Sequence, residues 1–373
     1  MKNTQEIENI VKAIRPKAKF VKAAYLDAVS SDNISIRDYY LVSLYDAKID
    51  SVFNKCKYGY FIINNSYLSS FAYNLYLGII LHHKKDPIQE RNLILHNFKK
   101  FYAEQLYYFN NCIFSRAILI ETLLEERNMR EAFDYIKTDS NLSQTAKSVA
   151  SIMNSLISSH ELGHHIFNHE SGYSVFIHEL PDEYKLYISR IQSTYPEAFF
   201  EEIICDLFSV HSNIEDINDT VLLKDRLNTI IWGYASFAIM FSLVKSAKAT
   251  SNEIADKYDD NINFDSIKKF HRDYPYTIGV DLDFKERAHI VIEYCKLIAS
   301  TFSIELNNDV NDLIHPDNIL EYLYSIMEDI MLTNDNSVRS VSMLLSESLH
   351  NHSEGSDYLF LRSKTFESER DLE

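Results

Sequence analysis

The sequence contains little glycine, proline and cysteine, and each shortage excludes a class of protein. Only 7 Gly and 6 Pro occur among 373 residues, which disfavours a fold built on many tight turns. The 4 Cys form no C-x-x-C pair, and residues 1–20 hold no apolar run of the kind found in a signal peptide. We therefore expect a cytoplasmic protein with reduced, buried thiols.

Positive charge is scarce as well. Lys and Arg total 37 against 54 for Asp and Glu, which gives a formal net charge of -17. No basic stripe is present that would release counterions from a phosphate backbone. We expect no nucleic-acid partner.

Apolar and aromatic side chains are abundant by contrast, with 46% hydrophobic residues, 25 Tyr and 22 Phe. A chain of this length can bury a large core. Together with the shortage of turn residues, this composition favours a mainly α fold of the α+β class. We expect a single unit over residues 1–348, followed by a polar, Ser-rich tail at 349–373.

Hydrophobic periodicity assigns most of the chain to helices. Residues 1–31 fit one or two amphipathic helices broken at Pro16. β-Branched and aromatic residues at about 39–64 instead indicate a small antiparallel β element. Further helices are expected to begin after Pro181 and after Pro196.

One apolar segment allows two interpretations. Residues 227–244 carry no charge between Arg226 and Lys245 and reach the lower edge of the length that spans a bilayer. Polar residues dilute the segment, and the chain contains no second one like it. We expect a buried core helix, with a membrane span as the alternative.

The stretch "HELGH" contains an H-E-x-x-H motif formed by His160, Glu161 and His164. Apolar residues at three- and four-residue spacing over 149–157 continue into both histidines, so we expect them to face inward. Helix positions i and i+4 are about 40° apart, so both imidazoles can reach one ion, for which zinc is the usual metal. Glu161 would then act as the general base on a metal-activated water.

A third ligand has to come from another segment. His165 and His169 lie about 100° and 140° around the helix from His164 and cannot join the same ion. In "EEIICD", Glu202 and Asp206 place two carboxylates on one face of an otherwise apolar helix. We expect Glu202 to bind the metal and Asp206 to accept the outer N–H of a ligand histidine, with Glu201 as a rival ligand.

These two motifs resemble those of the gluzincin metallopeptidases, in which H-E-x-x-H and a downstream E-x-x-x-D supply two histidines and a glutamate to zinc. The strand-like segment "IDSVFNKCKYGYFIINNSYL" resembles the β-hairpin that precedes the active helix in such enzymes. The chain is also similar in plan to the phage-exclusion Lit-type peptidases. These resemblances imply a zincin-like helical domain and a protein or peptide substrate.

The family pattern is incomplete downstream of the second motif. Gluzincins often carry a His-Pro pair followed by Arg, whereas this chain offers His271, Tyr274 and Arg287 without a His-Pro pair. Each of these three could donate to the oxyanion that develops on the scissile carbonyl. They are candidate catalytic residues beside Glu161.

The function we expect from the sequence is zinc-dependent hydrolysis of peptide bonds. Two alternatives stay open. In one, the zincin-like domain binds a metal or a peptide without turnover and acts as a sensor or regulatory module. In the other, residues 227–244 anchor a membrane-associated metallopeptidase. The sequence leaves the cleavage preference and the oligomeric state open.

Overall fold

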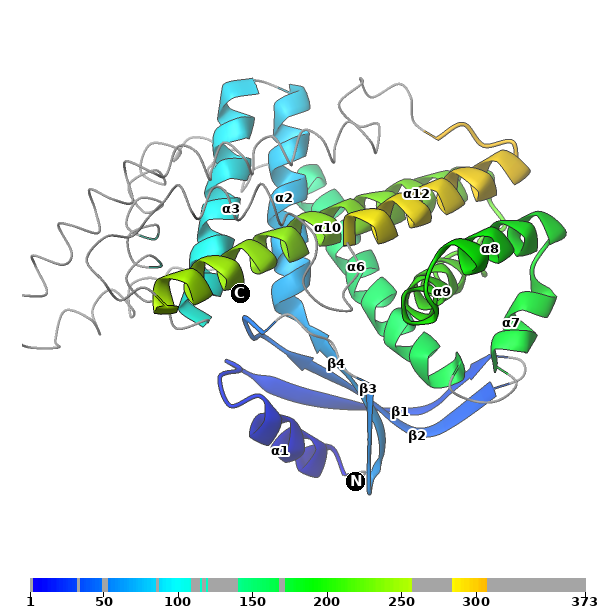
Figure 1. Ribbon diagram of the computed structural model, residues 1–373, viewed down its shortest axis with the longest axis horizontal. Coiled ribbons are helices and arrows are strands. Elements are labelled where there is room, and N and C mark those ends of the chain that lie inside the picture. Colours follow the sequence, from blue (N-terminus) through cyan, green and yellow to red (C-terminus); the bar gives the residue numbers. More distant parts are fainter. Residues whose placement is uncertain are drawn as a thin grey trace, which may run out of the picture.

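The computed structural model describes residues 3–31, 34–48, 53–84, 87–108, 115, 119, 140–167, 172–256 and 284–306. Within these ranges the chain is mostly helical and contains one four-stranded sheet (Figure 1). The expected mainly α class with a small β element is therefore confirmed. The expected polar tail at 349–373 lies outside the described residues.

The N-terminal part of the chain forms a helix and the sheet. Its elements are α1 (Thr4–Ile14), β1 (Val21–Ser31), β2 (Ile34–Leu44), β3 (Phe53–Cys56) and β4 (Gly59–Asn65). The strand order is β1-β2-β4-β3, with antiparallel pairing at both ends and parallel pairing between β2 and β4. The expectation of a small antiparallel β element at about 39–64 is confirmed for the hairpin of β3 and β4, but it was wrong for β2 and β4, which are parallel.

A second correction concerns the segment expected to be helical at 1–31. Only its first half is a helix, and the second half is β1, which pairs with β2 in a register that places Tyr25 opposite Tyr40. Val21 and Ala23 are buried while Lys22 and Ala24 are exposed, the period-two pattern of a strand with one buried face. Pairing with β2 has overridden the local helical preference of this Lys- and Ala-containing stretch.

The two faces of the sheet pack against different helices. Tyr40, Val42 and Phe61 belong to the face that α1 covers with Ile7 and Val11. The intervening residues Tyr39 and Ile62 point the other way and pack against Leu162, in the middle of the H-E-x-x-H motif. The sheet therefore lies directly beside the helix that carries the motif.

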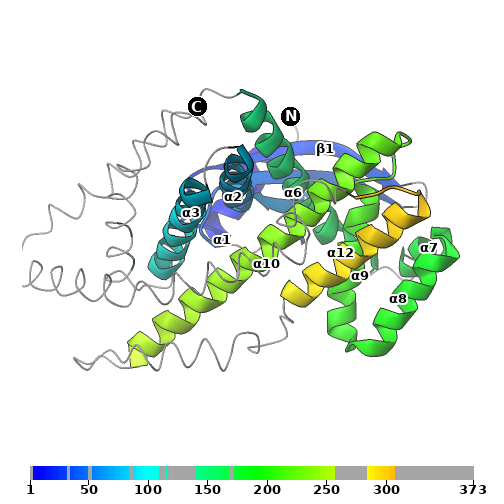
Figure 2. The same ribbon diagram turned by 90° about the horizontal axis from the view of Figure 1, so that it is seen from above.

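The remaining described elements are helices. They are α2 (Ser66–Lys84), α3 (Pro87–Tyr108), α6 (Ser140–Phe167), α7 (Gly172–Glu179), α8 (Asp182–Thr194), α9 (Glu197–Ser212), α10 (Thr220–Asp256) and α12 (Phe284–Thr301). The expected starts of α8 and α9 are confirmed, because Pro181 and Pro196 occupy their N-cap positions. In Figure 1 the C-terminal half of α6 lies between the sheet and α9, and Figure 2 shows α10 and α12 side by side.

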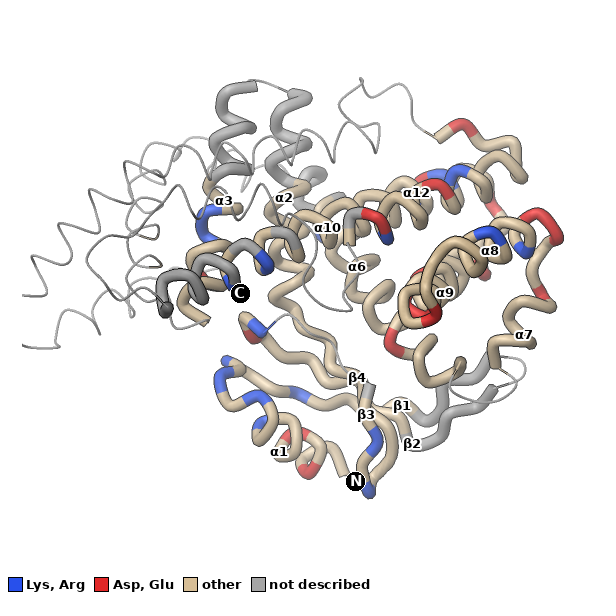
Figure 3. The backbone as a smooth tube through the Cα atoms, viewed as in Figure 1, with Lys and Arg blue, Asp and Glu red and all other residues tan. Residues whose placement is uncertain are grey.

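Helix α10 contains the long apolar segment. Its part from Thr220 to Lys245 is, among the described residues, the single helix long and apolar enough to cross a membrane. Of its most apolar window, 76% is buried inside the fold, as in a core helix. Residues of both charge signs occur on α1 and on α8 (Figure 3).

Candidate metal centre

The H-E-x-x-H motif lies near the C-terminal end of α6, on a helix 28 residues long. Val149, Met153 and Leu156 are buried along one stripe of this helix. His160 and His164 continue the stripe, and their side chains are 14% and 24% exposed. The prediction that the histidines face inward is therefore confirmed.

Close packing between α6 and α9 brings the second motif to the first. A Cβ atom at Gly163 would lie 3.2 Å from the Cα of Cys205, so the two helix backbones approach more closely here than a larger residue would permit. Cys205 lies between Glu202 and Asp206 in sequence, and both carboxylates approach His160 of α6. Gly163 thus positions the carboxylates of α9 beside the histidines.

Three side chains converge on one point. The Nε2 atoms of His160 and His164 are 3.1 Å apart, and the Glu202 carboxylate oxygens lie 3.4 Å from the first and 3.3 Å from the second. Ligands at bond lengths of about 2.0–2.1 Å in a tetrahedral arrangement stand about 3.3 Å from one another. His160, His164 and Glu202 could therefore hold a metal ion, as expected from the sequence.

The outer nitrogens of both histidines face carboxylates. His160 Nδ1 lies 2.8 Å from Asp206 Oδ1, and His164 Nδ1 lies 3.4 Å from Glu201 Oε1. Asp206 thus contacts His160, as the sequence predicted. Glu201 lies outside the candidate ligand group but contacts His164. This contact of Glu201 could not be predicted from the sequence, because the crossing of α9 over α6 decides which histidine an adjacent residue reaches.

Asp206 is surrounded by donors from two further helices. Arg287 of α12 donates from Nε to Oδ2 at 2.7 Å and from Nη2 to Oδ1 at 2.8 Å. Tyr234 of α10 donates to Oδ1 at 3.1 Å, and its hydroxyl is 2.9 Å from Ser209 Oγ. The roles of Tyr234 and Ser209 could not be predicted from the sequence, because the residues around each of them have the same apolar pattern as an ordinary core helix.

Of the three expected oxyanion donors, Arg287 is the one that the structure describes. Arg287 lies behind the candidate ligands, where its Nη1 donates to Glu202 Oε2 at 2.8 Å, and the residue is 6% exposed. His271 and Tyr274 lie outside the described residues. His165 packs its ring 4.7 Å from that of Tyr60 on β4 and stays out of the ligand group, as expected, and His169 also lies outside the described residues.

The pKa values of the site reflect strong charge pairing. Burial by itself lowers the pKa of His160, but the Asp206 carboxylate raises it to about 9. Burial would raise the pKa of Glu202, yet hydrogen bonds with the two histidines and the charge of Arg287 bring it below its usual range. Asp206 likewise has a lowered pKa, since Arg287 and His160 outweigh its burial. Without a metal, His160 is therefore a cation among carboxylates.

Glu161 occupies the side of the site that faces the sheet. The pKa of Tyr39 on β2 is raised, first by burial and then by the negative charge of Glu161. The same carboxylate contributes to the raised pKa of His164, after the opposing effect of burial and the hydrogen bond with Glu202. Glu161 therefore lies close to both a candidate ligand and strand β2, without belonging to the ligand group.

The chain was compared with known proteins in three ways. No protein family matches it, and neither the curated proteins nor the solved structures include a match. The resemblance to gluzincins accordingly rests on the two motifs and on the geometry that brings them together.

Proposed function

We propose that the protein is a zinc-dependent metallopeptidase with a zincin-like fold. The observation that carries this proposal is the convergence of His160, His164 and Glu202. The two Nε2 atoms are 3.1 Å apart, Glu202 Oε2 lies 3.4 Å from His160 Nε2, and Glu202 Oε1 lies 3.3 Å from His164 Nε2, so the three side chains could hold one ion. Two imidazoles and one carboxylate are the donor set of many catalytic zinc sites, which keep a fourth position open. When bound there, zinc supplies Lewis acidity, which polarises a carbonyl and lowers the pKa of water.

Glu161 is the general base in this proposal. Its negative charge acts on His164, and it lies outside the candidate ligand group, which supports a role in proton transfer rather than in binding the ion. Its carboxylate accepts a proton from the attacking water and then passes that proton to the leaving amine. Asp206 Oδ1 lies 2.8 Å from His160 Nδ1, so the outer nitrogen faces a carboxylate and Nε2 is left for the ion.

A peptide substrate is proposed from the resemblance to gluzincins and from the position of the sheet. Among the described strands, β3 stands at the end of the strand order and pairs with β4 alone, and both strands pack against α6. An extended peptide can add to such an edge through main-chain hydrogen bonds. A strand added there would run close to α6 and could present a carbonyl to the site.

The proposal is tested by mapping new protein termini in cells. Cells that express the wild type are compared with cells that express Glu161→Gln at the same level, and peptides beginning or ending at new sites are identified by mass spectrometry. We expect termini that occur with the wild type alone. Stoichiometric zinc in the purified protein without any wild-type-specific terminus would favour a non-catalytic sensor instead.

A further inference from the structure

The guanidinium of Arg287 joins the two carboxylates of α9 that serve the metal site. Nε and Nη2 bind both oxygens of Asp206 at 2.7 and 2.8 Å, while Nη1 binds Glu202 Oε2 at 2.8 Å. One rigid planar group therefore contacts a candidate ligand directly and a second one, His160, through Asp206. A guanidinium can do this because its donors point outward in a fixed fork, which the ammonium of lysine lacks.

An aromatic stack covers one face of the guanidinium. The Arg287 Cζ atom lies 4.5 Å from the ring centroid of Phe284, one turn earlier on α12. The Phe284 ring in turn stacks on Phe241 of α10, with centroids 3.6 Å apart and planes 4° apart. This stack holds the plane of the fork by cation–π contact, although neither phenylalanine belongs to the metal site.

The surroundings of Arg287 do not suit a donor to substrate. Each of its three nitrogens already donates to a carboxylate oxygen, and the side chain is 8% exposed. The Glu202 side chain, by contrast, is 36% exposed and needs a partner to hold one rotamer. Arg287 supplies that partner on the oxygen Oε2 and balances two negative charges one helical turn apart.

We infer that Arg287 is a positioning residue, which holds Glu202 and, through Asp206, His160 in the arrangement that binds the metal. This inference rests on the metal site of the proposed function and is independent of peptidase activity. The planar fork and its stack on Phe284 together set the affinity for the ion. Removal of a hydrogen-bonding partner behind a metal ligand typically weakens binding by about 10- to 100-fold.

The test is the zinc dissociation constant of the purified full chain, measured by competition with a chromophoric chelator at fixed pH. Arg287→Lys keeps the charge but loses the fork, so we expect affinity to fall by about tenfold or more. Phe284→Leu keeps every hydrogen-bonding group, and we expect a loss of about two- to fivefold through the freed guanidinium plane. The absorption bands of the cobalt-substituted protein should shift in both variants, because the position of the Glu202 ligand changes.

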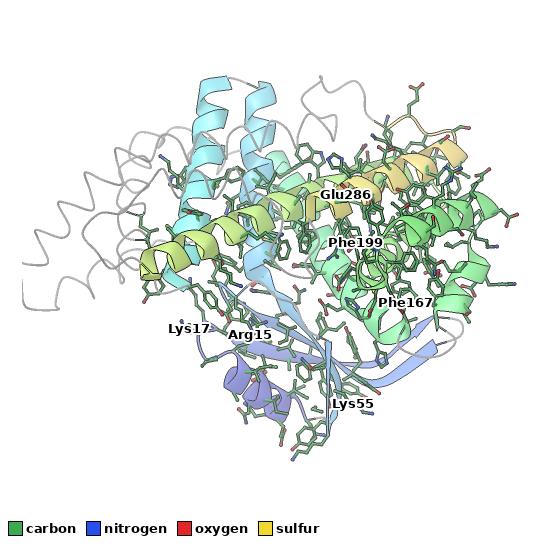
Figure 4. All side chains as sticks on the ribbon, viewed as in Figure 1. Arg15, Lys17, Lys55, Phe167, Phe199 and Glu286 are labelled. Atoms are coloured by element: carbon green, nitrogen blue, oxygen red, sulfur yellow. The ribbon has the colours of Figure 1, made fainter. Side chains whose placement is uncertain are left out.

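Arg15→Lys is the matched control. Arg15 is also a buried arginine paired with a carboxylate, Asp46, but it lies by the sheet and away from α9 (Figure 4). This variant should bind zinc within twofold of the wild type. The inference is overturned if Arg287→Lys also binds zinc within twofold and keeps the wild-type cobalt spectrum. A wild type that binds no zinc would overturn the metal site itself, and the inference with it.

Discussion

At the scale of single residues, the carboxylates around the two histidines differ in how firmly they are held. Asp206 is 2% exposed and binds Arg287 and Tyr234 besides contacting His160. The Glu201 side chain is 49% exposed and contacts His164 at 3.4 Å. A buried, fully bonded carboxylate orients an imidazole strongly, whereas an exposed one competes with water for the same nitrogen.

Substitution of the acidic residues of α9 should therefore give three graded effects on zinc content. We expect Glu202→Ala to lose tightly bound zinc, Asp206→Ala to bind it about tenfold or more weakly, and Glu201→Ala to stay within a few-fold of wild type. Zinc is measured by atomic absorption on folded variants after dialysis against a weak chelator. His160→Ala and His164→Ala serve as controls that should contain no zinc. A Glu201→Ala protein without zinc would contradict the ligand assignment.

Glu161 should separate metal binding from catalysis. Because its carboxylate is outside the ligand group, Glu161→Gln should retain stoichiometric zinc while turnover falls by about two orders of magnitude or more. Turnover is measured on whichever peptide the mapping of termini identifies. Loss of zinc from a folded Glu161→Gln protein would refute the assignment of Glu161 as the base.

The pKa of His160 predicts how zinc affinity depends on pH. In the metal-free protein this pKa is raised to about 9, so below that pH a zinc ion has to displace a proton. Zinc affinity should accordingly rise with pH from 6 to about 9, as measured by chelator competition at each pH. The folding stability of the metal-free protein has the opposite pH dependence. The stabilisation that the His160 imidazolium gives is complete below about pH 6.5 and is lost as the pH rises toward 9. Asp206→Ala should move the levelling point of affinity to lower pH.

At the scale of the elements, the spacing between α6 and α9 decides whether the ligands meet. Gly163 faces the backbone of Cys205, which is rigid, with 3.2 Å between its would-be Cβ and the Cys205 Cα. Gly233 on α10 also approaches α6, but a Cβ there would meet side-chain atoms rather than backbone, Leu156 Cδ1 at 3.2 Å and Met153 Cγ at 3.3 Å. These two helix glycines form a natural pair for comparison.

We expect Gly163→Ala to weaken zinc binding by about tenfold, because α9 must move by a few tenths of an ångström and carry Glu202 with it. Gly233→Ala should leave zinc affinity unchanged, since the neighbouring side chains can adjust and alanine favours the helix by up to about 1 kcal/mol. Both affinities are measured as for the ligand variants. Equal affinity in the two variants would show that close packing at Gly163 does not set the site.

At the scale of the whole molecule, the site lies where helices that are far apart in the sequence pack together. Its side chains come from α6, α9, α10 and α12. The sheet flanks the site where Tyr39 of β2 packs against Leu162 of α6. A bound ion would therefore stabilise the packing of α6 against α9, in addition to its chemical role. Ligands that bind only the folded state raise stability by mass action.

Removal of the metal should consequently lower the melting temperature of the wild type. Zinc at about 100 times its dissociation constant stabilises a folded protein by about 2.7 kcal/mol, which corresponds to a shift of about 3 °C for a chain of this size. The measurement is a thermal scan with zinc and with excess chelator. Glu202→Ala is the control and should show the same melting temperature in both; a wild type insensitive to the chelator would contradict a zinc site that bridges these helices.

The features that depend only on neighbouring residues in the chain could be predicted from the sequence. Spacing at i and i+4 placed His160 with His164 on one helix stripe and Glu202 with Asp206 on another, and Pro181 and Pro196 marked the helix starts. Helical periodicity acts within a few residues, so a single chain segment contains all the information it needs. These predictions are confirmed for that reason.

Tertiary structure alone decided the rest. β1 is a strand because β2 pairs with it, and β2 runs parallel to β4. Neither pairing can be predicted from the residues of β1 or β2 alone. Arg287, which is 81 residues from Asp206 along the chain, donates to Glu202 and Asp206 because α12 packs beside α9. Contacts over such separations depend on how the helices cross, and the pattern of one helix does not specify which face of another it will meet.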